Sequence, residues 1–198
     1  MAVSLKVATN FFLYDRKSDE KMMCDCCDKY KKALEIELCE YKKGKRIEEL
    51  FLEEHVHWTA YDVEPLLDLA IERDHNTIKH INFTGARLPD SVGTKIARLV
   101  SKSSSLESCM IAKNVFGIQT ILTIVQNMQP ALRRLVVSGN HCETVCSRVF
   151  DALVYFLERH PPASADEYRR WDLSKDFDDR HFYRLALSRI SQSKIKHT

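Results

Sequence analysis

Apolar and polar positions recur along the chain in five related segments. Each segment has the spacing L-x-x-L-x-L, in which Ile, Val, Phe or another large residue can replace Leu. The segments begin at Ile47, Ile78, Leu106, Leu132 and Tyr168, and their starts are 31, 28, 26 and 36 residues apart. Self-similarity at such a period is the signature of a stacked repeat architecture. The alternating apolar positions predict one short strand in each segment.

A helix is predicted after each strand. Apolar residues recur with helical spacing in residues 63–71, 92–100, 118–125, 145–157 and 182–190. A unit of strand, turn and helix cannot bury its apolar side alone, so the units must stack on one another. We therefore predict a short right-handed α/β solenoid, with a parallel sheet on the concave side and helices on the convex side.

The residue three places after each strand motif supports the same prediction. Repeats three and four have Asn114 and Asn140 there, and repeat five has Asp176, whose side chains can bond the backbone as it leaves the strand. Repeats one and two have His55 and Ala86 instead. We expect the turns of these two repeats to be less regular.

The rest of the chain divides around the repeats. Residues 1–43 are expected to form an N-terminal cap, residues 44–190 a domain of four to five repeats, and residues 191–198 a polar tail. Within the cap, residues 19–39 are mostly helical in pattern, whereas residues 3–7 alternate like a strand. Residues 34–38 also alternate, so an additional strand that extends the sheet is an alternative there.

These repeats resemble the ribonuclease-inhibitor type of leucine-rich repeat over about residues 45–190. Residues 74–140 are similar in period and layout to the C-terminal domain of tropomodulins, which cap actin filaments. Residues 1–43 contain no actin- or tropomyosin-binding helix that would carry that function over. The resemblance implies non-catalytic protein–protein recognition through the concave sheet, as an adaptor, an assembly factor or a subunit of a larger complex.

Composition excludes several other classes. The 198 residues are 44% apolar and 29% charged, which is typical of a globular protein, and the net charge of +2 does not indicate a dedicated nucleic-acid binder. No apolar run approaches the length of a membrane span. No phosphate-binding, zinc-protease or serine-hydrolase motif occurs, so we expect no enzyme. The N-terminus lacks a secretory pattern, so a cytoplasmic or nuclear location is expected.

Residues between the apolar strand positions face the concave surface. The candidate partner-binding residues there are Phe51, His80, Asn82, Met110, Arg133, Arg134, Arg169 and Arg170. Phe51 and Met110 are possible apolar anchors, and the four arginines would crowd one area because parallel strands lie about 4.8 Å apart. Arginine forks suit carboxylates and phosphates, which predicts docking of an acidic or phosphorylated segment.

Two alternatives for the arginines stay open. They could be solvated pairs balanced by Asp166, Glu167 and Asp172, or they could bind RNA or phosphate. The opposite end of the sheet is acidic, with Glu48, Glu49, Glu53 and Glu54. The charge on the concave face is therefore expected to change sign from repeat one to repeat five.

A cysteine cluster suggests a different function. Cys24, Cys26 and Cys27 lie together, with Cys39 twelve residues further on, and thiolates suit zinc. Structural zinc sites usually pair two C-x₂₋₄-C motifs, and the second is missing here. The alternative function is therefore a metal- or redox-responsive module. The competing interpretation is that these cysteines are simply small residues at the start of a helix. No cofactor other than zinc is expected.

Overall fold

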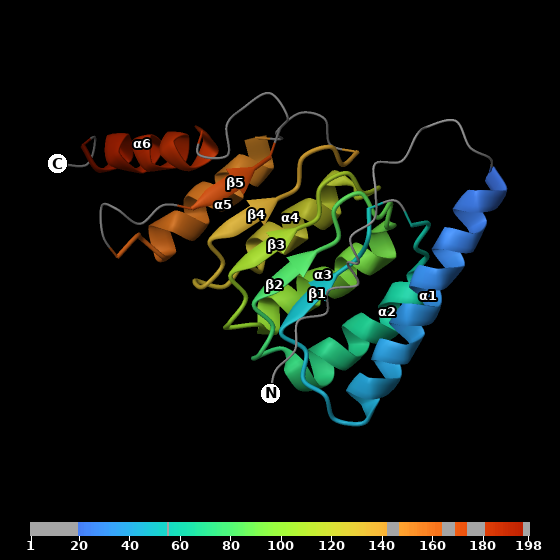
Figure 1. Cartoon of the computed structure of the whole chain (residues 1–198). Coiled ribbons are helices and arrows are strands. Elements are labelled where there is room, and N and C mark those ends of the chain that lie inside the picture. Colours follow the sequence, from blue (N-terminus) through green and yellow to red (C-terminus); the bar gives the residue numbers. More distant parts are fainter. Residues whose placement is uncertain (1–19, 55, 142–146, 164–168, 174–180, 196–198) are drawn as a thin grey trace.

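Strands and helices alternate regularly along the chain (Figure 1). The structure is a computed structural model that describes residues 20–54, 56–141, 147–163, 169–173 and 181–195. The strands are β1 (Glu49–Phe51), β2 (His80–Asn82), β3 (Ser108–Met110), β4 (Arg134–Val136) and β5 (Arg170–Asp172). The helices are α1 (Glu20–Lys42), α2 (Ala60–Leu69), α3 (Asp90–Lys102), α4 (Ile118–Gln126), α5 (Ser147–Arg159) and α6 (His181–Ile195), and a π-helical turn (Ala70–Asp74) continues α2.

The five strands form one parallel sheet in the order β1-β2-β3-β4-β5. Their central residues are aligned across the sheet and are at most 1% exposed: Leu50, Ile81, Cys109, Leu135 and Trp171. These are the fourth positions of the five repeat motifs. The predicted α/β repeat fold is therefore confirmed, with every predicted strand present and in register.

Helices α2 to α5 lie on one side of this sheet, each packed against the next, and in the described part of the chain no helix lies on the other side (Figure 1). In α3, for example, Val92, Ile96 and Leu99 are fully buried, as their helical spacing predicts. The core is thus a continuous apolar layer between strands and helices.

Buried asparagines close the turns of repeats three and four. Asn114 Nδ2 donates to the carbonyl oxygens of Phe83 and Ile111 at 2.8 and 2.9 Å, and its Oδ1 accepts from Leu88 N at 2.9 Å. Asn140 Nδ2 donates to the carbonyls of Ile111 and Val137 at 3.0 and 2.7 Å. Each asparagine side chain is therefore a hydrogen-bond partner for backbone groups of its own repeat and of the preceding one.

The turn of repeat two differs, as its sequence predicts. Among the described residues of this turn, both Gly85 and Arg87 have positive φ, at 71° and 54°. The equivalent turns of repeats three and four each have one such residue, Lys113 at 55° and Gly139 at 71°. Asp176 and His55, at the same motif position in repeats five and one, lie outside the described residues.

Helix α1 packs against α2 at the N-terminal end of the solenoid (Figure 1). Leu34 and Tyr41 are buried there, and Lys31 forms an ion pair with Asp62 of α2 at 3.0 Å. Residues 34–38 are inside this helix, so the alternative of an extra strand there is wrong. Residues 3–7 lie outside the described part, and α6 continues to Ile195, past the expected start of the polar tail.

Candidate functional site

Two rows of side chains cross the concave face of the sheet. The register defines the first row as Glu49, His80, Ser108, Arg134 and Arg170, and the second row as Phe51, Asn82, Met110, Val136 and Asp172. Side chains on neighbouring strands of such a row are about 4.8 Å apart. The first row therefore changes from an acidic residue on β1 to basic residues on β4 and β5.

Four of the predicted residues meet at the β1 to β3 end of these rows. Phe51, Asn82 and Met110 are neighbours in the second row, and His80 lies beside them in the first. All four are half-buried. The Asn82 Oδ1 accepts a hydrogen bond from Thr84 N at 3.2 Å, which holds this side chain in place between the two apolar ones. The structure thus brings these predicted residues together on one surface.

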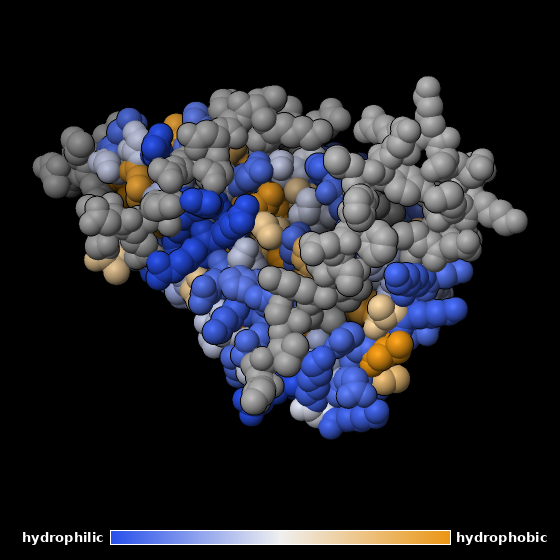
Figure 2. Space-filling model, in the orientation of Figure 1, coloured by the Kyte–Doolittle hydropathy of each residue, from blue (hydrophilic) through white to orange (hydrophobic). Residues whose placement is uncertain are grey.

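Arg133 and Arg134 lie where β4 begins. Both are exposed, and within the described part of the chain neither forms an ion pair. Arg134 is aligned with the half-buried Arg170 of β5. Figure 2 shows strongly hydrophilic side chains gathered near the start of β4, next to apolar side chains along the sheet. We call Arg133, Arg134, Met110 and Val136 the β4 patch.

Arg169 lies elsewhere and does not belong to this patch. It is only 3% exposed, its guanidinium lies 5.0 Å from the centroid of the Phe156 ring, and its Nη1 donates to the Leu132 carbonyl at 2.8 Å. The expected crowding of four guanidinium groups on the concave surface is therefore wrong. Arg169 therefore makes contacts within the fold, with α5 and with the preceding repeat, and does not face a partner.

An ion pair that the sequence analysis did not predict spans the turns at the acidic end. Glu54 crosses over Gly85 of repeat two and accepts a hydrogen bond from Lys113 Nζ at 2.7 Å. A Cβ at Gly85 would lie 2.2 Å from Glu54 Cγ. The sequence did contain a signal for this ion pair. Lys113 replaces the glycine that repeats two and four have at the same motif position, Gly85 and Gly139. The pair neutralises one of the four carboxylates expected at this end.

Helix geometry rules out one metal ion held by all four predicted cysteine ligands. All four predicted ligands lie in α1, and the side chains of Cys24 and Cys26 lie outside the described part. Cys27 and Cys39 are twelve residues apart, which separates them by about 18 Å along a helix at 1.5 Å per residue. A zinc ion binds each sulfur at about 2.3 Å, so one ion cannot hold Cys39 together with the others.

The remaining described residues contain no alternative metal cluster. No group of three or more His, Cys, Asp or Glu side chains is placed there to hold an ion. Cys109 is fully buried in β3, and burial raises the pKa of its thiol to about 12. The described helices also include none that is long and apolar enough to span a membrane.

A search of solved structures finds a neighbour with the same architecture. The tropomodulin C-terminal domain of Caenorhabditis elegans aligns with a TM-score of 0.57 over 84% of this chain and 97% of that chain, at 12% sequence identity. The chain has a leucine-rich-repeat fold. At this identity the similarity establishes the fold alone, and it does not show a ribonuclease-inhibitor-type family. No protein-family model and no curated protein sequence matches the chain.

Proposed function

We propose that this leucine-rich-repeat chain is a non-catalytic scaffold that binds a partner protein through the concave face of its sheet. The observation that carries the proposal is the β4 patch. Two exposed arginines there have no ion-pair partner within the described residues, and one of them, Arg134, lies on the same face of β4 as Val136, which is aligned with Met110. Exposed cations beside an accessible apolar surface are the composition of a protein-binding site.

The chemistry of the patch favours an acidic segment of the partner. A guanidinium donates two parallel hydrogen bonds to a carboxylate or phosphate, and Arg133 and Arg134 offer two such forks from consecutive residues. Met110 and Val136 are aligned on neighbouring strands and supply apolar contact on the face that carries Arg134. A partner segment with an aspartate, glutamate or phosphorylated residue next to an apolar side chain matches this arrangement.

The first row also favours one orientation of the partner. It has Glu49 at its β1 end and Arg134 and Arg170 at its other end. Complementary charge therefore places the acidic part of the bound segment over β4 and β5, and its less acidic part over β1 and β2. Such complementarity contributes to specificity and to the association rate more than to affinity alone.

Affinity purification of the full chain from cells, with quantitative mass spectrometry, tests this proposal. The variant Arg133→Glu/Arg134→Glu reverses the charge of the β4 patch. Its matched control is Arg98→Glu/Lys102→Glu, which makes the same change of charge at two exposed residues of α3 on the convex side. We expect the patch variant to lose a partner that both the wild type and the control retain, and we expect this partner to survive nuclease treatment.

Equal folding of both variants is checked by circular dichroism before the comparison is made. Equal recovery of every specific partner by the wild type and the patch variant would contradict the proposal. Loss of the partner after nuclease treatment would show that the arginines bind RNA instead, because nucleic acid would then be the bridging component.

A further inference from the structure

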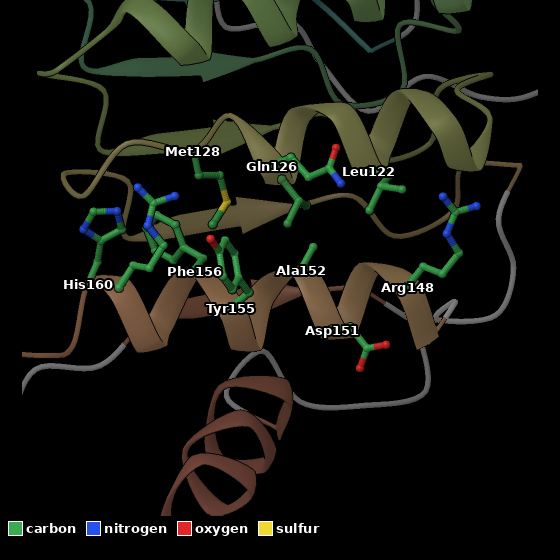
Figure 3. A pocket seen from close by; sticks show the side chains of 11 residues that line it. Leu122, Gln126, Met128, Arg148, Asp151, Ala152, Tyr155, Phe156 and His160 are labelled. Atoms are coloured by element: carbon green, nitrogen blue, oxygen red, sulfur yellow. The ribbon is translucent and has the colours of Figure 1, made fainter. Parts of the chain in front are cut away.

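A second candidate surface lies on the convex side, between α4 and α5. It is a groove of about 530 Å³ that opens to solvent. Leu122, Met128 and Phe156 are at most 6% exposed and form its apolar floor, while Tyr155 is 60% exposed and forms part of its rim. Figure 3 shows Leu122 on α4 and Tyr155 and Phe156 on α5, with Met128 just past the end of α4. The groove shares no residue with the β4 patch.

The groove exists because α4 is shorter than its neighbour. α4 has 9 residues and α5 has 13, which at 1.5 Å per residue leaves α5 longer by about 6 Å, or roughly one turn. Beyond Gln126 the chain turns away through Met128, so α4 does not run beside the last turn of α5. In Figure 3 Tyr155, Phe156 and His160 extend past the end of α4.

Both ends of the groove are cationic. Arg148 lies in the first turn of α5 and Arg159 is its last residue, and within the described residues neither forms an ion pair. Arg159 lies 5.5 Å from the centroid of the Tyr155 ring. The one carboxylate that lines the groove, Asp151, accepts from Arg189 of α6 at 2.5 Å and is therefore neutralised. The groove thus has an apolar centre between two positive charges.

The size of the groove decides between a helical and an extended ligand. Its volume falls in the range of pockets that hold a small ligand, so it accommodates a few side chains but not a long helix. Arg148 and Arg159 are eleven residues apart on α5, which is about 16 Å along the helix axis. An extended chain covers this distance in about five residues at 3.3 Å per residue.

We propose that this groove binds an extended segment of a partner protein that carries apolar side chains between two carboxylates about five residues apart. Each carboxylate pairs with one arginine, and the apolar side chains between them lie against Tyr155 and the floor. This site is independent of the concave face and extends the scaffold to two binding surfaces. The proposal stands or falls separately from the function assigned to the β4 patch.

The test uses the full chain, labelled with ¹⁵N, and a synthetic ten-residue peptide with leucine and phenylalanine between two glutamates five residues apart. Two further peptides are compared with it: one has lysine in place of both glutamates, and one has the same residues in scrambled order. We expect the glutamate peptide to shift the amide signals of residues 122–128 and 148–160 in a saturable way. The lysine and scrambled peptides are expected to bind at least tenfold more weakly.

Charge reversal by Arg148→Glu/Arg159→Glu provides the decisive variant. Both residues are exposed, so the fold is expected to be retained, and Arg133→Glu/Arg134→Glu serves as the matched control. We expect the groove variant to bind the glutamate peptide at least tenfold more weakly and to prefer the lysine peptide, while the control binds as the wild type does. Absence of saturable binding, unchanged binding by the groove variant, or shifts confined to the concave strands would overturn the proposal.

Discussion

Two arginine pairs occupy equivalent positions in consecutive repeats and yet have different surroundings. Arg133 and Arg169 each follow the first apolar residue of their repeat motif. Arg133 is exposed, whereas Arg169 is 3% exposed, lies against Phe156 and donates to the Leu132 carbonyl. The repeat therefore determines where the backbone lies, and the elements packed beside it determine whether a side chain stabilises the fold or is available to a partner.

Replacement of each arginine by methionine is the strongest test of this difference. Arg169→Met leaves the Leu132 carbonyl without its charged donor and removes the contact with Phe156, so we expect a loss of about 3 kcal/mol of unfolding free energy. Arg133→Met changes an exposed side chain, and we expect a change within about 0.5 kcal/mol. Urea unfolding measures both values. Equal values for the two variants would contradict the distinction.

A second pair of equivalent residues sharpens the comparison. Asn114 of repeat three and Ala86 of repeat two hold the same motif position, and Asn114 bonds the backbone of both repeats through Phe83, Leu88 and Ile111. We expect Asn114→Ala to cost about 2 kcal/mol, because several buried backbone groups lose their partner. Thermal and urea unfolding measure the cost. Asn114→Asp is the matched variant, since it keeps the acceptor but removes the donor.

Gly85 and Lys113, which directly precede Ala86 and Asn114, also hold equivalent positions in repeats two and three, and we expect a smaller difference between them. Gly85 has φ 71°, and an added Cβ would meet Glu54 Cγ at 2.2 Å, whereas Lys113 already holds a side chain at φ 55°. We expect Gly85→Ala to cost about 1 to 2 kcal/mol, since alanine is strained at positive φ. Lys113→Ala removes only an exposed ion pair, so its cost is expected to stay within about 0.5 kcal/mol. Comparable costs in urea unfolding would show that the turn adapts.

The smallest expected effect is on His160. Burial, together with the charges of Arg159 and Arg169, lowers the pKa of this imidazole below its ordinary value of 6.5. The unfolded chain then takes up the proton first, so this group reduces stability as the pH falls through 6.5. We expect Arg169→Met to raise the pKa of His160, and Arg133→Met to leave it unchanged. An NMR titration of the imidazole protons measures both, and an equal pKa in the two variants would show that Arg169 does not act on His160.

Much of the fold could be predicted from the sequence because it depends on local periodicity. The five strand motifs and the helical spacing after them identify which residues enter the core, whatever lies beside them. Burial of Arg169 could not be predicted in this way, because the Phe156 ring that it contacts comes from another element. The pattern in residues 118–125 indicates the length of α4, but the groove follows only from how α5 packs against it.

The cysteine cluster shows the opposite case, in which residues close in sequence are separated by the fold. Cys24, Cys26, Cys27 and Cys39 are close in sequence and of suitable chemistry, which suggested a zinc site. Their place in one helix separates Cys27 from Cys39 by about 18 Å. Cys39 therefore cannot share one ion with the other three cysteines, although it lies close to them in sequence. By contrast, Phe51, Asn82 and Met110 are far apart in sequence, and the repeat period correctly brings them together.

Hydroxyl-radical footprinting of the chain with its captured partner tests the central claim most directly. Met110 lies in the middle of the second row on the concave face, and Tyr61 of α2 is 91% exposed on the convex side and serves as an internal reference. If the concave sheet is the working surface, the partner slows oxidation of Met110 severalfold and leaves Tyr61 unchanged. Oxidation of Met110 at the same rate in the free and bound chain would contradict the account.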